Sequence, residues 1–211
     1  MNDKQKNLRL LPKPLLLFVH KLIERTVVLF IKLKFSPNTL TVLALLLGLG
    51  SGVFFGMEHP IWAAGLLILC GIFDILDGMV AVKTMRTTVF GAIFDSTLDR
   101  YSEFFVYLGL AYYFRNHWAI WVLFFTFLGS TMVSYTRARA EGLGIECKVG
   151  IMQRAERIVL VSLGAIIGPL LDIYVPVIIG ILIFIALISN IAAFQRVFHV
   201  KKVEKQRNKT A

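Results

Sequence analysis

Long apolar runs alternate with short polar breaks along most of this chain. The breaks carry turn-forming or charged residues, as at Glu58–Pro60, Lys83–Arg86 and Asp172–Pro176. Six apolar runs come close to the ~20 residues that a helix needs to cross a bilayer, at about 38–57, 61–82, 89–113, 117–136, 155–174 and 176–195. The pattern predicts an all-α integral membrane protein with six transmembrane helices.

Composition agrees with a membrane protein that forms one domain over residues 1–211. Hydrophobic residues make up 57% of the chain and charged residues only 17%, whereas a soluble domain usually carries about 25% charged residues. We expect a six-span core at 38–196, followed by a basic cytoplasmic tail at 197–211.

Positive charge is distributed unevenly among the polar segments. Eight Lys and Arg residues precede the first span, and more lie between the second and third spans, between the fourth and fifth spans and in the tail. The three other loops hold Arg115 as their one basic residue. Because basic loops stay cytoplasmic, we expect a multi-pass cell-membrane protein with both termini and the basic loops in the cytoplasm. This topology and anionic lipid account for the net charge of +10, so no nucleic-acid partner is required.

Residues 13–34, KPLLLFVHKLIERTVVLFIKLK, form a different kind of segment. On a helix, most apolar residues of this segment lie on one side. Four charged residues lie on the other side: Lys21, Glu24, Arg25 and Lys32. This favours an amphipathic amino-terminal helix that lies in the cytoplasmic membrane interface. A seventh span is the alternative, but the charges in the middle of the segment oppose it.

Four aspartates lie in or beside two neighbouring apolar runs. Asp74 and Asp77 are three residues apart, and Asp95 and Asp99 are four apart, so each pair shares a helix face. Two antiparallel spans would bring the pairs together near the cytoplasm, where crowded carboxylates stay ionised only among cations. Oxygen ligands without clustered Cys or His indicate Mg²⁺ or Mn²⁺, and two such ions could bind a diphosphate. The alternative, that the aspartates merely cap helix ends, does not explain this spacing.

The spacing resembles the signature of the CDP-alcohol phosphotransferase (CDP-alcohol phosphatidyltransferase) family, D-x2-D-G-x2-A-R-x8-G-x3-D-x3-D. The spans and the amino-terminal segment are also similar to the family, so the resemblance covers nearly the whole chain. SYTRARAEGLG and QRAER resemble the acceptor region of its phosphatidylinositol phosphate synthase branch. The residues that fill the signature, with every spacing kept, are Asp74, Asp77, Gly78, Ala81, Gly91, Asp95 and Asp99.

The resemblance implies a metal-dependent transferase whose donor, CDP-diacylglycerol, keeps its tails in the membrane lipid. The four aspartates would hold two metal ions, and Asp99 would also remove the proton of the acceptor hydroxyl before CMP leaves. The positions implied at the nucleotide are Pro37, Asn38, Thr39, Gly78, Ala81, Thr88 and Gly91.

Basic residues around the fourth-to-fifth connection indicate the acceptor. Arg154 and Arg157 are three residues apart at the start of a span, and Arg137 lies at the end of the preceding one. Arginines suit a phosphate held by paired hydrogen bonds, which predicts a phosphorylated polyol as the acceptor. Ordinary positive-inside charge is the alternative. The resemblance favours inositol phosphate, with glycerol 3-phosphate next and serine or free inositol behind it.

One position departs from the family pattern, because Val82 stands where the family has arginine. Lys83 and Arg86 are near enough to supply the missing charge, and a weakened donor site is the alternative.

Two other function classes stay open: an ion-coupled transporter, which intramembrane carboxylates also mark, and a scaffold without activity. The lack of a visible internal repeat opposes a transporter, and release of CMP would separate the three classes.

Two further features concern packing around the aspartates. Gly48, Gly52 and Gly56 form a row of small residues that permits close helix contact. We expect this row to serve internal packing and not a dimer face, although a homodimer stays open. Glu103 extends the face of Asp99 by one helical turn, which indicates a supporting role.

Overall fold

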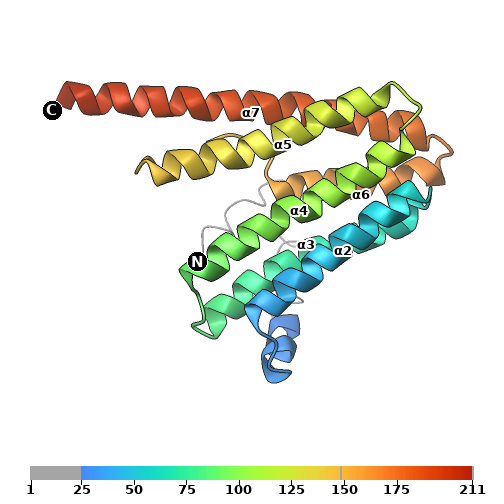
Figure 1. The fold of residues 1–211 in the computed structure, drawn as a ribbon, viewed down its shortest axis with the longest axis horizontal. Helices are drawn as coiled ribbons and strands as arrows, with labels where there is room; N and C mark the ends of the chain where they lie inside the picture. The colour runs from blue at the N-terminus through green and yellow to red at the C-terminus, as the bar shows by residue number, and fades with distance from the viewer. Residues whose placement is uncertain (1–24, 148, 211) are drawn as a thin grey trace.

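The computed structural model describes residues 25–147 and 149–210, and this part of the chain is helical between its turns (Figure 1). It contains no strand, which confirms the all-α prediction for the described residues. A short helical segment at 25–32 precedes six long helices: α2 (Pro37–Gly56), α3 (Pro60–Lys83), α4 (Val89–Tyr113), α5 (Ala119–Gly142), α6 (Arg154–Leu170) and α7 (Tyr174–Thr210).

The helices begin and end where the sequence has turn-forming residues. Pro37 and Pro60 occupy the first turns of α2 and α3, where the missing backbone N–H removes no helical hydrogen bond. Thr88 caps α4, since its hydroxyl accepts a 2.9 Å hydrogen bond from the backbone N–H of Gly91. After α2, Glu58 adopts φ +65°, a left-handed conformation that helps to turn the chain into α3. The predicted breaks before α3 and α4 are therefore confirmed.

Four of the described helices, α2, α3, α5 and α7, are long and apolar enough to cross a membrane. Helix α6 has only 17 residues, and α4 carries four charged residues, Asp95, Asp99, Arg100 and Glu103. The protein is therefore an all-α membrane protein, and length and hydropathy identify four of the six predicted spans.

Two helices extend beyond the apolar runs that are predicted as spans. The last apolar run ends near 195, but α7 continues through the basic residues to Thr210, and α5 continues to Gly142 instead of ending near 136. Neither extension contains proline, and Lys, Glu, Gln and Arg are good helix formers. Nothing in the local sequence therefore ends the helix where the hydrophobicity ends. The predicted tail at 197–211 is largely an extension of α7.

The predicted interfacial helix at 13–34 lies partly outside the described residues. Within the described part, the segment 25–32 packs its buried Val27 into a small core that includes Leu40 of α2 and Leu76 of α3. This contact packs the segment against the half of α3 that carries Asp74 and Asp77. Its position at a membrane interface stays a prediction.

Helices α2 and α4 cross at close range because glycines lie on both sides of the crossing. A Cβ added at Gly109 would lie 1.9 Å from the carbonyl oxygen of Gly52, and a Cβ at Gly52 would lie 2.1 Å from the carbonyl oxygen of Phe105. A Cβ at Gly48 would meet the hydroxyl of Ser102 at 2.0 Å. The predicted small-residue row therefore packs inside the protein and holds α4 at backbone contact distance from α2.

Helix α6 joins two groups of helices. Helix α2 packs on α3 and α4, whereas α5 runs alongside α7, and these two project together beyond the other helices (Figure 1). Helix α6 packs on both α3 and α7. Its first residue, Arg154, consequently reaches the part of α3 and α4 that carries the aspartates.

Candidate active site

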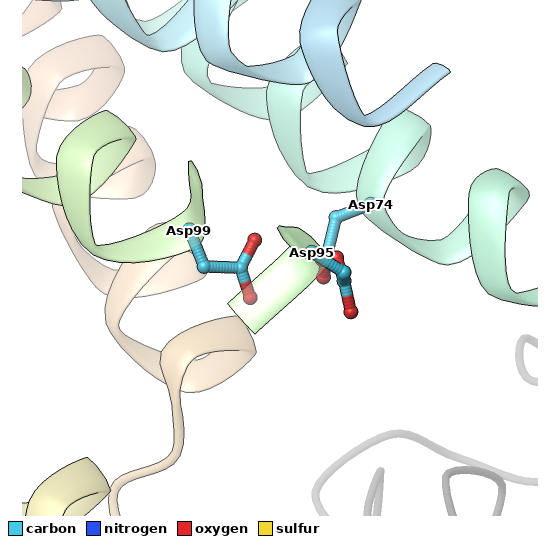
Figure 2. Close-up of side chains that lie close together, drawn as sticks. All are labelled: Asp74, Asp95 and Asp99. Atoms are coloured by element: carbon cyan, nitrogen blue, oxygen red, sulfur yellow. The ribbon is translucent and has the colours of Figure 1, made fainter. Parts of the chain in front are cut away.

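Three aspartates from two helices form one group of carboxylates (Figure 2). Asp74 projects from α3, and Asp95 and Asp99 project from α4. One oxygen from each of the three lies within 4.8 Å of the others. The side chains meet because α3 and α4 both pack on α2. The expectation that the two aspartate-bearing helices meet is confirmed for these three residues.

Arg154 compensates part of the charge of this carboxylate group. Its Nη1 lies 2.9 Å from Oδ1 of Asp74 and 2.6 Å from Oδ1 of Asp99, and its side chain is only 14% exposed. Like charges this close repel strongly where water is scarce, so the ionised carboxylates require a cation among them. The guanidinium of Arg154 supplies one such positive charge, against Asp74 and Asp99.

Asp77 lies outside the group of three. It is 3% exposed and accepts a 2.8 Å hydrogen bond from Oγ1 of Thr41 in α2. Oγ1 of Thr41 also lies 3.1 Å from the carbonyl oxygen of Pro37, one turn earlier. The structure thus groups three of the four predicted carboxylates and orients the fourth through α2.

The donor set of the carboxylate group fits a hard divalent cation. Oxygens from three carboxylates that share one small volume are the ligands that Mg²⁺ and Mn²⁺ prefer. Arg154 contacts two of these carboxylates, which shows that a cationic group is accommodated among them.

Three residues predicted at the nucleotide, Asn38, Thr88 and Gly91, meet where the amino-terminal ends of α2 and α4 adjoin. A Cβ added at Gly91 would lie 3.0 Å from Oγ1 of Thr88 and 3.6 Å from Oδ1 of Asn38, so the two helix starts adjoin there. The first N–H groups of a helix have no partner within the helix and suit a phosphate. The other predicted members lie in the first turn of α2, Pro37 and Thr39, and on α3, Gly78 and Ala81.

A pocket adjoins the carboxylate group on the side of α6. It has an empty volume of about 230 Å³ and is lined by Asp99, Arg100, Glu103, Ser134, Arg154 and Arg157. It thus brings Asp99 together with two of the three arginines predicted at the acceptor. The third, Arg137, does not line this pocket, and its half-exposed side chain pairs with Glu141 on α5, with 2.9 Å between Nε and Oε1.

Arg157 is held inside the protein by a carboxylate and a backbone carbonyl. Its Nε and Nη2 donate to Oε1 and Oε2 of Glu103 at 2.6 and 2.9 Å, and its Nη1 donates to the carbonyl oxygen of Met152 at 2.9 Å. Arg157 is 2% exposed, although it lines the pocket. Glu103 therefore supports an arginine of the pocket from a position one turn along α4 from Asp99.

Arg196 is a buried basic residue that the sequence pattern left unassigned. It is 3% exposed, and it donates through Nε to the carbonyl oxygen of Val149 at 2.9 Å and through Nη1 to that of Val133. These bonds tie α7 to α5 and to the loop that leads into α6. An arginine at the end of an apolar run looks like ordinary positive-inside charge until its burial is known.

Ser134, which lines the pocket, is a second residue that the sequence did not indicate, because a single serine in a helix forms no pattern.

Known proteins share this arrangement of sequence and fold. Residues 34–192 match the family model described as CDP-alcohol phosphatidyltransferase. The chain is 36% identical to the archaetidylinositol phosphate synthase of Methanothermobacter thermautotrophicus, over 66% of this chain and 71% of that protein. It is 34% identical to the protein of the same name from Pyrococcus horikoshii, over 79% of this chain and 84% of that protein.

Solved structures match over a similar extent. The Mycobacterium tuberculosis phosphatidylinositol phosphate synthase with CDP-DAG bound has a TM-score of 0.77 and 25% identity, and the match covers 85% of this chain and 94% of that one. The structure of that synthase in complex with manganese and citrate has a TM-score of 0.77 and 26% identity, with 84% and 88% covered. Because the family model covers most of the chain, including all three grouped aspartates, this protein belongs to the CDP-alcohol phosphatidyltransferase family.

Proposed function

We propose that this enzyme transfers the phosphatidyl group of CDP-diacylglycerol to inositol phosphate and releases CMP. The observation that carries the proposal is the place of Asp99, which belongs both to the carboxylate group and to the arginine-lined pocket. The names of the relatives, archaetidylinositol phosphate synthase and phosphatidylinositol phosphate synthase, support the acceptor. The solved structure with CDP-DAG bound supports the donor.

The aspartates would hold two Mg²⁺ or Mn²⁺ ions at the donor diphosphate. Asp74, Asp95 and Asp99 offer oxygens from one group, and Asp77, oriented by Thr41, is the fourth proposed ligand. Such ions, when bound, draw charge from the diphosphate and stabilise the departing phosphate of CMP. The manganese complex of the M. tuberculosis synthase supports Mn²⁺ as one of the two candidates.

The nucleotide of the donor would lie where the starts of α2 and α4 adjoin. Asn38 and Thr88 offer polar side chains there, and the missing side chain of Gly91 leaves room between them. Pro37, Thr39, Gly78 and Ala81 complete the proposed nucleotide set.

Asp99 would act as the base of the transfer. A hydroxyl bound in the pocket could give its proton to Asp99 and then attack the lipid-side phosphorus. Arg154 and Arg157 line the same pocket and carry the charge that an acceptor phosphate requires. Arg137 stays a prediction, because its pairing with Glu141 gives it no contact with this pocket in the structure.

We further propose that all six long helices span the cell membrane, with both termini and the active site on the cytoplasmic side. Charged residues of α4 and α6 pair with each other inside the bundle, as Asp99 does with Arg154 and Glu103 with Arg157. Such pairing lowers the cost of placing these two helices in the membrane. The interfacial helix at 13–34 and a homodimer are parts of the same proposal.

The proposed reaction is tested by measuring CMP release from CDP-diacylglycerol with each acceptor in turn, and by identifying the lipid product by mass. We expect turnover with inositol phosphate and a product of the mass of phosphatidylinositol phosphate. Turnover with glycerol 3-phosphate alone would contradict inositol phosphate as the acceptor, but it would agree with a pocket that binds the acceptor phosphate. Equal turnover with free inositol or serine would contradict the phosphate pocket, and no release with any acceptor would favour a scaffold.

A separate prediction concerns Val82, the valine at the family's arginine position. Lys83 ends α3 and Arg86 follows in the turn, and both are exposed. If either supplies the missing charge, its replacement by alanine should raise the KM for CDP-diacylglycerol, because a charge-assisted contact contributes ~1.5–3 kcal/mol, or roughly 10–150-fold. The control is Arg115→Ala, at the opposite end of α4. Unchanged donor kinetics in both variants would show that the site works without this charge.

A further inference from the structure

We infer that Glu103 is a positioning residue for the acceptor, which acts through Arg157 and not by contact with the reacting atoms. The inference rests on the proposed function, since it concerns how the acceptor pocket of that reaction is built. It follows from the contacts between α4 and α6, from two cavities that share one wall, and from the backbone that precedes Arg154.

Two ion pairs join α4 to α6 as successive rungs. The outer rung joins Asp99 to Arg154 at 2.6 Å, and the inner rung joins Glu103 to Arg157 at 2.6 and 2.9 Å. The two acidic residues are one turn apart on α4, and the two arginines are one turn apart on α6. Helix α6 packs mainly on α3 and α7, whereas α4 packs mainly on α2. The two ion pairs therefore connect two helices whose main packing partners differ.

The inner rung lies in the wall that the acceptor pocket shares with a second cavity. The second cavity, with an empty volume of about 320 Å³, adjoins this pocket, and its lining adds apolar side chains such as Val106 and Val161. Glu103, Arg154 and Arg157 line both this cavity and the acceptor pocket. Loss of the inner rung would therefore open the polar pocket to the apolar space beside it.

The inner rung also fixes the backbone from which Arg154 projects. The Nη1 of Arg157 donates to the carbonyl oxygen of Met152, two residues before Arg154. Met152 adopts φ +71°, which is unfavourable for a residue with a side chain and persists only when contacts hold it. Arg157 supplies one such contact, so Glu103, Arg157 and Met152 form a continuous link to the start of α6.

Further contacts give Glu103 a single orientation. The hydroxyl of Tyr107 lies 3.5 Å from Oε1 of Glu103 and 3.3 Å from Oγ of Ser130 on α5. The Glu103 side chain is 14% exposed, and its bidentate pair fixes the plane of the Arg157 guanidinium as well as its distance.

Two substitutions weaken the inner rung without removing its bulk. Glu103→Gln replaces one acceptor oxygen by an NH₂ group, so only one of the two bonds to Arg157 can form. Arg157→Lys keeps the positive charge but cannot form two parallel bonds. The matched control is Glu58→Gln, the same chemical change at an exposed residue in the turn between α2 and α3.

The experiment compares the two single variants, their double variant and the control in the CMP-release assay. We expect each single variant to raise the KM for inositol phosphate about tenfold or more and to leave the KM for CDP-diacylglycerol within about twofold. The double variant should be no worse than the more impaired single variant, because Glu103 acts through Arg157. Thermal unfolding in detergent establishes that each variant is folded.

Several outcomes would overturn the inference. These are an acceptor KM that is unchanged in folded Glu103→Gln, additive losses in the double variant, or an equal rise in both KM values, which indicates a general structural role. If Glu103→Gln does not fold, the inference is tested with Arg157→Lys, by comparing its KM for inositol phosphate with its KM for CDP-diacylglycerol.

Failure of the proposed function is seen separately, in the wild type. If the wild type uses another alcohol phosphate, the same comparison is made with that acceptor. If the wild type releases no CMP, inositol phosphate should still raise its melting temperature and should not raise that of folded Glu103→Gln or Arg157→Lys. Absence of that rise in the wild type would overturn the inference.

Discussion

Replacing Asp99 by asparagine is expected to reduce CMP release by roughly 10²–10⁴-fold, the range that a positioned general base contributes. Asp99 lies within the carboxylate group and also lines the acceptor pocket, so the substitution removes a proposed metal ligand and the proposed base together. Asp74→Asn and Asp95→Asn should also abolish activity, because an amide oxygen lacks the charge that balances a divalent cation. Initial rates of CMP release with saturating Mg²⁺ or Mn²⁺ measure each effect.

Asp77→Asn tests the fourth carboxylate, which the structure places against Thr41 and outside the group of three. We expect loss of activity here as well, since the proposal makes Asp77 a metal ligand.

The matched control for the aspartate variants is Asp172→Asn in the turn between α6 and α7. This residue is exposed, lies at the far end of α6 from Arg154 and adopts φ +55°, which asparagine tolerates well. It should retain the wild-type rate. Excess chelator should abolish turnover in both the wild type and this control. Full turnover in excess chelator would contradict metal dependence, and a wild-type rate in Asp99→Asn would contradict both roles of that residue.

The second large effect is expected from Gly109→Ala at the crossing of α2 and α4. The added Cβ would lie 1.9 Å from the carbonyl oxygen of Gly52, which is backbone and cannot rotate aside. Overpacking of this kind costs about 1–3 kcal/mol or more, and relief requires the two helices to separate. Because Asp95 and Asp99 are on α4, separation would also shift them away from Asp74. We expect a lower melting temperature in detergent together with reduced CMP release.

Gly65→Ala on α3 provides the opposite expectation. A Cβ at Gly65 would meet nothing within 4 Å, so alanine should be tolerated and should favour the helix by up to about 1 kcal/mol. Gly180 on α7 has the same open surroundings and serves as a second control. Equal melting temperatures for Gly109→Ala and Gly65→Ala would contradict the close crossing of α2 and α4.

The helical fold and the spacing of the aspartates within each helix could be predicted because the signals are local. An apolar run of membrane length and a spacing of three or four residues are properties of a single helix. The start of α4 was predicted at 89 and is observed there, after the capping residue Thr88. Helix α7 runs past the predicted span, because hydrophobicity ends near 195 while the helix-forming residues continue to Thr210.

The roles of the three arginines could not be distinguished from the sequence. Arg137, Arg154 and Arg157 were predicted to share one task, but the structure gives each a different partner: Glu141 for the first, Asp74 and Asp99 for the second, and Glu103 for the third. Basic residues near a membrane surface look alike in sequence, because the positive-inside pattern enriches them whether or not they are buried.

The sequence by itself determined that this protein is helical, that it belongs in a membrane, and that its aspartates lie three and four residues apart on two neighbouring helices, because each of these depends on residues within one or two turns. Only the tertiary structure decided which charges meet across helices. The pairing of Arg154 with Asp74 and Asp99 joins residues far apart in the chain, and that of Glu103 with Arg157 does the same. The partner of each depends on how the helices cross, and the crossing is set by contacts such as that between Gly52 and Gly109, where the backbones meet because neither residue has a side chain.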